Sequence, residues 1–336
     1  MTPRNRVIAA LTHQRPDKVP CDVRLTTDMS DQMFKHISDK NFIWKYIEPI
    51  FTRIELEDPG TSPKPGYYQD VFGVLWNRTL DKNYGVVENS QVTPDNLARY
   101  KFPSPLTDDY IKACQVNLAA AGQTYRLGRL NLSLWERAWT LRGMENLMMD
   151  LAADPDFAFD LFSRICDYNL AVLTRTLKHL PLDGIHFGDD WGSQNSLQMS
   201  PSMWRTLIKP HLKKMYSLVR NQGKYVSIHS CGKVDELFDD LIEIGVNSFN
   251  PFQPEVIDVD WAIKNYKGKL CFWGGISTQI ALPFGTPSDV YAQTKHLIDS
   301  ARNGGLIVTP AHSIPAGIPP ANIIAMLEAM RDCSDN

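Results

Sequence analysis

The 336-residue sequence lacks the features of several specialised classes of protein. No apolar run approaches the roughly 18 residues that a membrane helix needs. The opening segment is polar and is interrupted by Pro16, unlike a signal peptide. The formal net charge of −3 lacks the positive excess that is typical of nucleic-acid-binding proteins. We therefore expect a cytoplasmic protein that contacts neither a membrane nor nucleic acid.

Cysteine is also scarce. The six cysteines are widely scattered, without the spacing of a disulfide-bonded secreted domain, so we expect reduced thiols that are free to bind a metal. Hydrophobic residues make up 43% and charged residues 22% of the chain, as in ordinary globular proteins. The length allows one large or two smaller domains.

Short β-rich segments alternate with longer amphipathic segments, which predicts βα units and a parallel sheet. Apolar residues at helical spacing predict helices over residues 155–180 and 233–245. Eight strands separated by helices are typical of a (β/α)8 TIM barrel, an α/β fold. We predict one such domain over residues 1–336, with a β-hairpin insertion at residues 65–92 after the second strand region. The predicted strands cover residues 18–24, 51–56, 125–133, 183–190, 225–230, 246–251, 270–275 and 306–312.

Polar side chains gather at the carboxyl ends of these strands, where barrels of this kind carry their chemistry. A strand end does not need them for packing, and a buried polar group without a partner costs about 1 to 3 kcal/mol. We therefore expect a ligand among them. The residues are Asp22, Arg24, His186, Asp189, Asp190, His229, Cys231, Asn250, Ser277 and His312.

His229 and Cys231 are the strongest pair in this set. Residues two apart on a strand face the same side, so an imidazole nitrogen and a thiolate can meet at one ion. Zinc accepts both kinds of ligand, and His312 at the end of the last strand is the best third ligand, which leaves one position open for substrate. The spacing alone also fits a hydrogen-bonded core histidine beside a small buried cysteine.

The other polar residues divide into catalytic and substrate-binding candidates. Asp189 or Asp190 can supply or relay a proton, although an N-cap or a salt bridge would also explain this pair. Arg24 either binds a substrate carboxylate or pairs with Asp22. His186 is either a base or a buried histidine that the backbone satisfies. The predicted substrate-binding residues are Asp22, Arg24, His186, Trp191, Gln194, Asn250, Phe252 and Ser277.

Several blocks of the sequence resemble the uroporphyrinogen decarboxylase superfamily. They are "TPRNRVIAALTHQRPDKVPCDV", "FGDDWGSQNSLQMSPSMWRTLIKPHLKKMYSLVRNQG", "IHSCGKVDELFDDLIEIGVNSFNPFQ" and "TPAHSIPAGIPPANIIAML". The resemblance covers most of the chain and implies a (β/α)8 barrel. Within the superfamily, the sequence is most similar to the cobamide-dependent methyltransferase branch.

The first predicted strand separates this chain from the decarboxylases. True decarboxylases carry an "RQAGR" loop there, which binds the many carboxylates of the substrate, whereas "CDVRLTTDMSDQM" offers only Arg24. The methyltransferase branch holds zinc with an HxC pair and a distant cysteine. His229 and Cys231 match the pair, and His312 stands near the position of the cysteine. A zinc ion with one sulfur ligand fewer is less suited to thiol methylation. The role that remains for it is Lewis-acid activation of an ether or alcohol oxygen.

The resemblance and the residues together predict a zinc-dependent methyltransferase. It would move a methyl group between a small methylated compound, such as a methoxy-aromatic, and a corrinoid (cobamide) carried by a partner protein, because the chain has no DxHxxG run of its own. A metal-free lyase that uses Asp22 and Arg24 remains an alternative. So does a non-catalytic barrel that binds a ligand or a corrinoid. A homodimer stays open.

Overall fold

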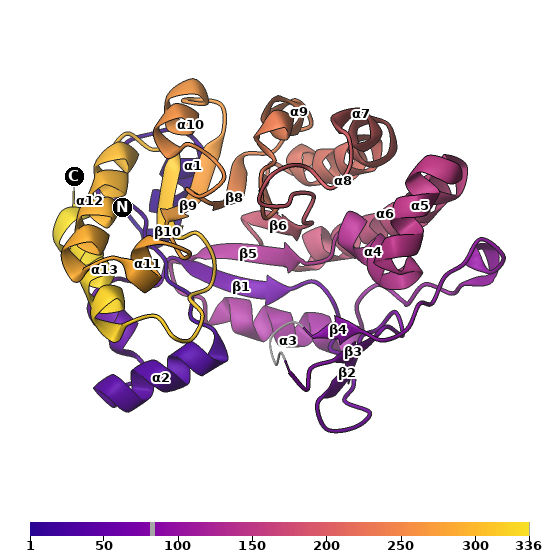
Figure 1. Ribbon diagram of the computed structural model, residues 1–336, viewed down its shortest axis with the longest axis horizontal. Coiled ribbons are helices and arrows are strands. Elements are labelled where there is room, and N and C mark those ends of the chain that lie inside the picture. The colour runs from indigo at the N-terminus through magenta and orange to yellow at the C-terminus, as the bar shows by residue number, and fades with distance from the viewer. Residues whose placement is uncertain (81–84, 336) are drawn as a thin grey trace.

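The computed structural model describes residues 1–80 and 85–335 and is built around a seven-stranded parallel sheet (Figure 1). The sheet order, β1-β5-β6-β7-β8-β9-β10, follows the chain, as expected when helices connect neighbouring parallel strands. The sheet curls into a half barrel, which matches a TIM-barrel-like fold. Its strands are β1 (Phe51–Glu55), β5 (Tyr125–Leu130), β6 (Gly184–Gly188), β7 (Tyr225–His229), β8 (Ser248–Phe252), β9 (Cys271–Ile276) and β10 (Leu306–Pro310).

The first predicted strand, residues 18–24, is wrong as a strand. This segment runs beside β10 and meets it through one isolated bridge, Cys21 with Val308. Lys18 pairs with Asp335, and Leu25, just past the segment, pairs with Ile314 after β10. Proline has no N–H to donate, so Pro20 interrupts any regular ladder. In the described part of the chain no ladder joins the segment to β1. It lies where an eighth strand would pair with β10, but only as extended chain.

Helices pack around the sheet (Figure 1). The long amphipathic helix that the sequence predicts over residues 155–180 is confirmed as α6 (Pro155–His179), and Asp154 caps its first turn. The helix predicted over residues 233–245 forms as η4 (Asp235–Leu237) and α9 (Phe238–Glu243). The other helical elements are α1 (Pro3–Leu11), α2 (Thr27–Ile37), η1 (Phe42–Lys45), η2 (Leu97–Arg99), α3 (Asp108–Ala119), α4 (Trp135–Arg142), α5 (Met144–Ala153), α7 (Pro201–Met203), the π-helical turn η3 (Trp204–Ile208), α8 (Lys209–Asn221), α10 (Val259–Asn265), α11 (Ala281–Phe284), α12 (Pro287–Ala301) and α13 (Pro320–Cys333).

A second, antiparallel sheet forms within residues 65–92, where the sequence predicts hairpins. Its strands are β2 (Tyr67–Gln69), β3 (Leu75–Asn77) and β4 (Val86–Val87), and residues 81–84 lie outside the described chain. Arg137 of α4 connects this sheet to the main fold. Its guanidinium donates to Asp70 at 2.6 Å and to Glu57 at 2.8 Å, and all three side chains are largely buried. The small sheet is therefore held against the carboxyl ends of β1 and β5.

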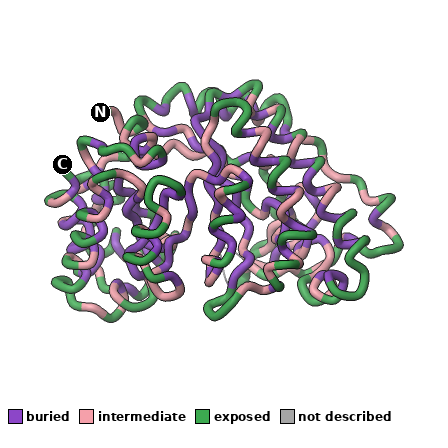
Figure 2. The backbone as a smooth tube through the Cα atoms, turned by 90° about the horizontal axis from the view of Figure 1, so that it is seen from above, coloured by how far each residue is buried: buried purple, intermediate pink, exposed green. Residues whose placement is uncertain are grey.

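The interior of the main sheet is apolar at one end and polar at the other. A small cluster that includes Leu11 of α1, Tyr125 and Leu127 of β5, Trp273 of β9 and Ile307 of β10 fills the amino-terminal end. Because side chains alternate between the two faces of a strand, the inward-facing residues that follow this apolar cluster lie nearer the carboxyl ends of the strands. The larger core lies between the sheet and the helices, and Figure 2 shows buried stretches inside and exposed residues on the outer turns. Among the described helices, none has both the length and the apolar character needed to cross a bilayer.

Candidate metal centre and substrate cavity

A cavity of about 870 Å³ opens at the carboxyl ends of the strands. This is the end at which (β/α)8 enzymes carry their active sites, and the volume suits a small organic molecule. The wall is polar, because strands, connecting loops and the small sheet all contribute charged side chains. Its charged and imidazole groups are Asp22, Arg24, Arg53, Glu55, Glu57, Asp58, Asp70, Arg78, Arg129, Glu136, Arg137, His186, Asp190, His229 and His312.

The structure brings the three predicted metal ligands together, with His229 and His312 in the cavity wall. His229 is the last residue of β7, Cys231 follows in the next turn, and His312 follows β10. One ligand atom from each residue lies within 4.8 Å of the other two. The Cys231 sulfur lies 3.4 Å from Nε2 of His229, and the two imidazole centroids are 5.7 Å apart. Two nitrogens and one sulfur form a donor set that suits zinc.

Asn250 of β8 selects the tautomer of His229. The Asn250 amide nitrogen donates to the carbonyl oxygen of Trp273 at 2.9 Å, so its oxygen faces Nδ1 of His229 at 2.6 Å. An amide oxygen only accepts, so Nδ1 must carry the imidazole hydrogen. The lone pair is then on Nε2, which faces Cys231. This arrangement, in which an outer hydrogen bond orients a metal-binding histidine, is common at metal sites.

The turn that carries Cys231 is held by its neighbours. Asp190 accepts the Cys231 backbone N–H at 2.8 Å, and its carboxylate lies 3.7 Å from Nε2 of His229. Gly232 adopts φ of +87°, and a Cβ there would lie 2.5 Å from the Ser193 carbonyl oxygen, so only glycine fits. The turn therefore positions the thiol beside the imidazole by backbone contacts.

The protonation of the ligands is compatible with metal binding. Burial, with a smaller effect of His229, lowers the pKa of His312, which keeps this imidazole neutral and able to ligate. Burial and the Asp190 carboxylate raise the pKa of the Cys231 thiol, so zinc would have to displace its proton. Three protein ligands leave one position of a tetrahedral ion for a substrate atom. The residues present thus fit zinc.

Asp189 does not have the predicted catalytic role in this geometry. It is fully buried, and its carboxylate accepts the backbone N–H groups of Leu134, Trp135 and Glu136 and the indole N–H of Trp191 at 2.8–3.3 Å. Burial raises the pKa of Asp189 to about 6, although these donors oppose the shift. Asp189 therefore caps α4 and faces away from the cavity, whereas Asp190 lines it.

Four predicted substrate-binding residues, Asp22, Arg24, His186 and Asn250, line the cavity. Asp22 forms an ion pair with Arg53, not with Arg24. The Arg24 carbonyl oxygen accepts the Ile314 N–H at 2.9 Å, but none of the described hydrogen bonds or ion pairs includes the Arg24 guanidinium. Burial, Arg129 and Arg53 together lower the pKa of this guanidinium. His186 shares a hydrogen bond of 2.9 Å with the Ser227 hydroxyl. Burial and His229 lower the pKa of His186 well below its ordinary value, so it is a neutral group.

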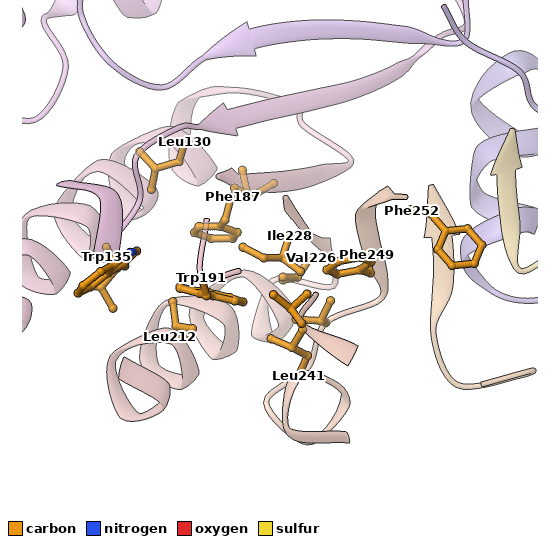
Figure 3. Close-up of a cluster of buried hydrophobic side chains, with 14 of the residues drawn as sticks. Leu130, Trp135, Phe187, Trp191, Leu212, Val226, Ile228, Leu241, Phe249 and Phe252 are labelled. Atoms are coloured by element: carbon orange, nitrogen blue, oxygen red, sulfur yellow. The ribbon is translucent and has the colours of Figure 1, made fainter. Parts of the chain in front are cut away.

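The other four predicted substrate-binding residues lie outside the described cavity wall. Trp191 and Phe252 belong to the buried hydrophobic cluster in Figure 3. The Phe252 ring also stacks on Phe272, with 4.3 Å between the ring centroids. Ser277 accepts the backbone N–H groups at the start of α11 and donates to Glu255. Gln194 is exposed on a surface loop. These four assignments are therefore corrected.

The sequence analysis missed several groups of the cavity wall. Arg53 and Arg129 stand on predicted strands, on the face that points inward, but they lie before the ends of these strands. Glu57 and Glu136 lie beyond the ends of the strands that precede them, and Glu136 is already part of α4. The inward alternation could have identified the two arginines. No local signal identifies Glu136, because its position depends on contacts between distant segments.

One solved structure has a similar fold over nearly the whole chain. A methyltransferase from Methanosarcina mazei superposes with a TM-score of 0.71 at 17% identity, over 98% of each chain. A GH10 endo-β-1,4-xylanase from Gloeophyllum trabeum gives a TM-score of 0.43 at 10% identity, over 67% of this chain and 80% of the xylanase. At such identities the likeness concerns the fold alone. No curated protein sequence matches the chain.

The family is established by sequence. The family model described as "Uroporphyrinogen decarboxylase (URO-D)" matches residues 73–333, which is most of the chain. The matched region contains β5 to β10 and all three residues of the candidate metal centre. The protein therefore belongs to the uroporphyrinogen decarboxylase family.

Proposed function

We propose that this protein is a zinc-dependent methyltransferase that moves a methyl group between a small methylated compound and a corrinoid carried by a partner protein. The observation that carries the proposal is the convergence of His229, Cys231 and His312 within 4.8 Å, with both imidazoles in the cavity wall. The cobamide-dependent branch of the family, which the sequence resembles, holds zinc with an HxC pair and a distant cysteine, and this chain offers His312 near the position of that cysteine. The solved methyltransferase from Methanosarcina mazei shares the fold.

The donor set favours an oxygen-bound methyl group. Zinc, when bound, would act as a Lewis acid on the heteroatom that carries the methyl group. A single thiolate donates less negative charge than two, so the centre is better suited to polarise an ether oxygen than to activate a thiolate. Asp190 holds the Cys231 turn, and Asn250 holds His229 in the ligating tautomer. A methoxy-aromatic compound fits the aromatic side chains Tyr68, Trp76 and Trp139 of the wall.

Arg24 is proposed to bind an anionic group of the substrate. It lines the same cavity as the metal centre and has no ion-pair partner in the described chain. Arg53 and Arg129 repel it, so a carboxylate beside Arg24 would relieve an unfavourable arrangement. His186 is a neutral hydrogen-bonding group on the facing strand. A small methoxylated carboxylate satisfies all these groups.

Metal analysis of purified variants is the direct test. We expect stoichiometric zinc in the wild type and its loss in His229→Ala, Cys231→Ala and His312→Ala. His296→Ala is the matched control, because this exposed histidine of α12 only pairs with Asp260. Zinc retained in His312→Ala would remove His312 from the centre, with Asp190 next to be examined. Absence of zinc from the wild type after growth and reconstitution with zinc would refute the centre.

Turnover distinguishes the alternatives. The protein, a methoxylated benzoate and free cob(I)alamin should yield methylcobalamin, which is followed by its visible spectrum, and chelation should abolish the reaction. Full activity after chelation would favour metal-free chemistry at Asp22 and Arg24. Binding of the methyl ether without any transfer, to free cobalamin or to a corrinoid protein, would favour a non-catalytic barrel.

A further inference from the structure

The small antiparallel sheet presents one face to the cavity, and this face carries an arginine. Tyr68 of β2 lies directly opposite Trp76 of β3, and both side chains line the cavity. Side chains two residues apart on a strand share a face, so Arg78, which follows β3, points the same way as Trp76. The Arg78 N–H donates to the Gly66 carbonyl oxygen at 2.7 Å, and the Arg78 side chain also lines the cavity. Two aromatic rings and a guanidinium therefore form one surface of the wall.

Local packing fixes the position of the Arg78 guanidinium. Its central carbon lies over the Tyr68 ring, 4.3 Å from the ring centroid, in a cation–π contact. The Tyr68 hydroxyl accepts the Gly60 N–H at 3.0 Å, which holds this ring in place. Gly85 adopts φ of +83°, and a Cβ there would lie 2.8 Å from Cγ of Arg78, so the glycine leaves room for the arginine. Stacking occupies the face of the guanidinium and leaves the N–H groups in its plane available to a ligand.

No acid of the described chain neutralises Arg78. None of the described hydrogen bonds or ion pairs includes its guanidinium, and its buried Nε has no hydrogen-bond partner among these residues. The acids of the cavity wall between the end of β1 and the small sheet all have other partners. These pairs are Glu55 with Arg129, Glu57 and Asp70 with Arg137, and Asp58 with Thr107. Because a partly buried cation without a counterion is unfavourable, an anion bound at Arg78 would stabilise this arrangement.

We infer that Arg78 forms a second anion subsite of the cavity, and that the substrate is an aromatic compound with two carboxylates, one bound by Arg24 and one by Arg78. This inference rests on the proposed function and narrows its substrate class. Arg24 lies in the extended segment beside β10, whereas Arg78 belongs to the small sheet, so the two guanidinium groups reach the cavity from different elements. A carboxylate matches the planar fork of N–H groups that each guanidinium offers.

The wall around Arg78 suits the aromatic body of such a compound. Trp139 of α4 meets Trp76 edge to face, with 6.5 Å between the ring centroids. The indole N–H of Trp76 donates to Asp70 at 3.2 Å, which fixes this ring. The cavity volume of about 870 Å³ lies in the upper part of the range that holds drug-sized molecules, so an aromatic body with two substituents has room.

Binding of unmethylated carboxylates tests the subsite without turnover. Calorimetry measures the Kd of benzoate and of three dicarboxylates of increasing span: isophthalate, terephthalate and biphenyl-4,4′-dicarboxylate. At least one dicarboxylate should bind the wild type about 10- to 100-fold more tightly than benzoate, and Arg78→Met should abolish this advantage. Unchanged affinities in Arg78→Met would overturn the inference. An equal loss of affinity for benzoate and for every dicarboxylate would show one anion site instead of two and would also overturn it.

Two further variants separate binding from folding. Arg331→Met is the matched control, because this exposed arginine also lies over a tyrosine ring, that of Tyr46, and pairs with Asp332 outside the cavity wall. It should leave all four affinities unchanged. Arg78→Lys keeps the positive charge but loses the planar fork, so it should restore only part of the dicarboxylate affinity. Circular dichroism establishes that each variant is folded.

Failure of the proposed function gives a different result. The titrations need neither a methyl donor nor a corrinoid, so they establish or refute the subsite even if the wild type transfers no methyl group. In that case methyl transfer is refuted, and the dicarboxylate is a ligand but not a methyl donor. If transfer occurs, the methoxy derivative of the tightest dicarboxylate should have a lower KM than 4-methoxybenzoate, and Arg78→Met should remove the difference. Methyl transfer with unchanged affinities in Arg78→Met would refute only the further inference.

Discussion

Removal of the Asn250 side chain should weaken zinc binding without unfolding the protein. Asn250 contacts no metal ligand atom directly, since it accepts from Nδ1 of His229 at 2.6 Å and donates to the Trp273 carbonyl at 2.9 Å. In Asn250→Ala the imidazole of His229 loses both its fixed tautomer and its fixed orientation. Nε2 then has to be aligned when the ion binds, and this lowers the affinity.

The expected size follows from the two contacts. Loss of an outer partner of a metal-binding histidine typically lowers affinity about 10- to 100-fold, which corresponds to roughly 1.4–2.8 kcal/mol of binding free energy. The hydrogen bond to the imidazole has a net value of about 0.5–1.5 kcal/mol, and the rest comes from alignment of the ring. Because the Asn250 side chain and the His229 imidazole both line an open cavity, water can replace the lost hydrogen-bond partner of His229. The fold should therefore be retained.

Competition with a chromophoric zinc chelator measures the Kd of each variant. Asn265→Ala is the matched control, because Asn265 is exposed on α10 and donates to the Trp261 carbonyl. Asn250→Asp keeps an acceptor for Nδ1 of His229 and loses only the donor to Trp273, so its affinity should stay within a few-fold of the wild type. A wild-type Kd in Asn250→Ala, or an equal loss in both Asn250 variants, would refute the assigned tautomer.

Two further predictions concern other parts of the fold. Burial lowers the pKa of the enclosed His211 imidazole to about 4, from 6.5, so the folded protein resists its protonation. The neutral His211 contributes its full stabilisation above about pH 6.5 and loses it as the pH falls toward 4. At pH 5 the loss in the free energy of unfolding is about 2 kcal/mol. His211→Leu should remove this pH dependence, as measured by the urea midpoints at pH 7 and pH 5. Arg24→Met should raise KM for 4-methoxybenzoate by about 10- to 100-fold, with little effect on KM for uncharged anisole. Equal changes with both substrates would contradict an anion site at Arg24.

Much of the sheet was predictable because its strands are short β-rich runs that end in polar turns. The seven strands found in the main sheet all fall within or overlap predicted segments. The approach of His229, Cys231 and His312 follows from the rule that parallel strands present their carboxyl ends on one side. The segment that was wrongly predicted to be a strand, residues 18–24, has the composition of a strand, but Pro20 prevents a continuous ladder of hydrogen bonds.

The alternation of side chains along β6 decides which of Asp189 and Asp190 faces the cavity. On β6, His186 faces the cavity, so alternation places Gly188 and then Asp190 on the same side and Asp189 on the opposite side. The same alternation fails on β8. Asn250 faces the cavity, but the pairing with β9 is irregular between Phe249 and Phe252, and the Phe252 ring lies in the core. A bulge of this kind has no reliable sequence signal.

Under the proposed function, the charged groups of the cavity wall would orient an anionic substrate. Arg53 of β1 and Arg129 of β5 lie close enough to Arg24 to lower its pKa, whereas the Asp190 carboxylate lies 3.7 Å from Nε2 of His229. An anionic end of a substrate would be attracted to the three arginines, which would leave its other end for the candidate metal centre. A centre with one thiolate keeps a net positive charge on a divalent ion, whereas two thiolates would neutralise it. In the proposed centre, His312 in place of a second sulfur would thus favour chemistry at oxygen, while the strands that position the ligands stay the same.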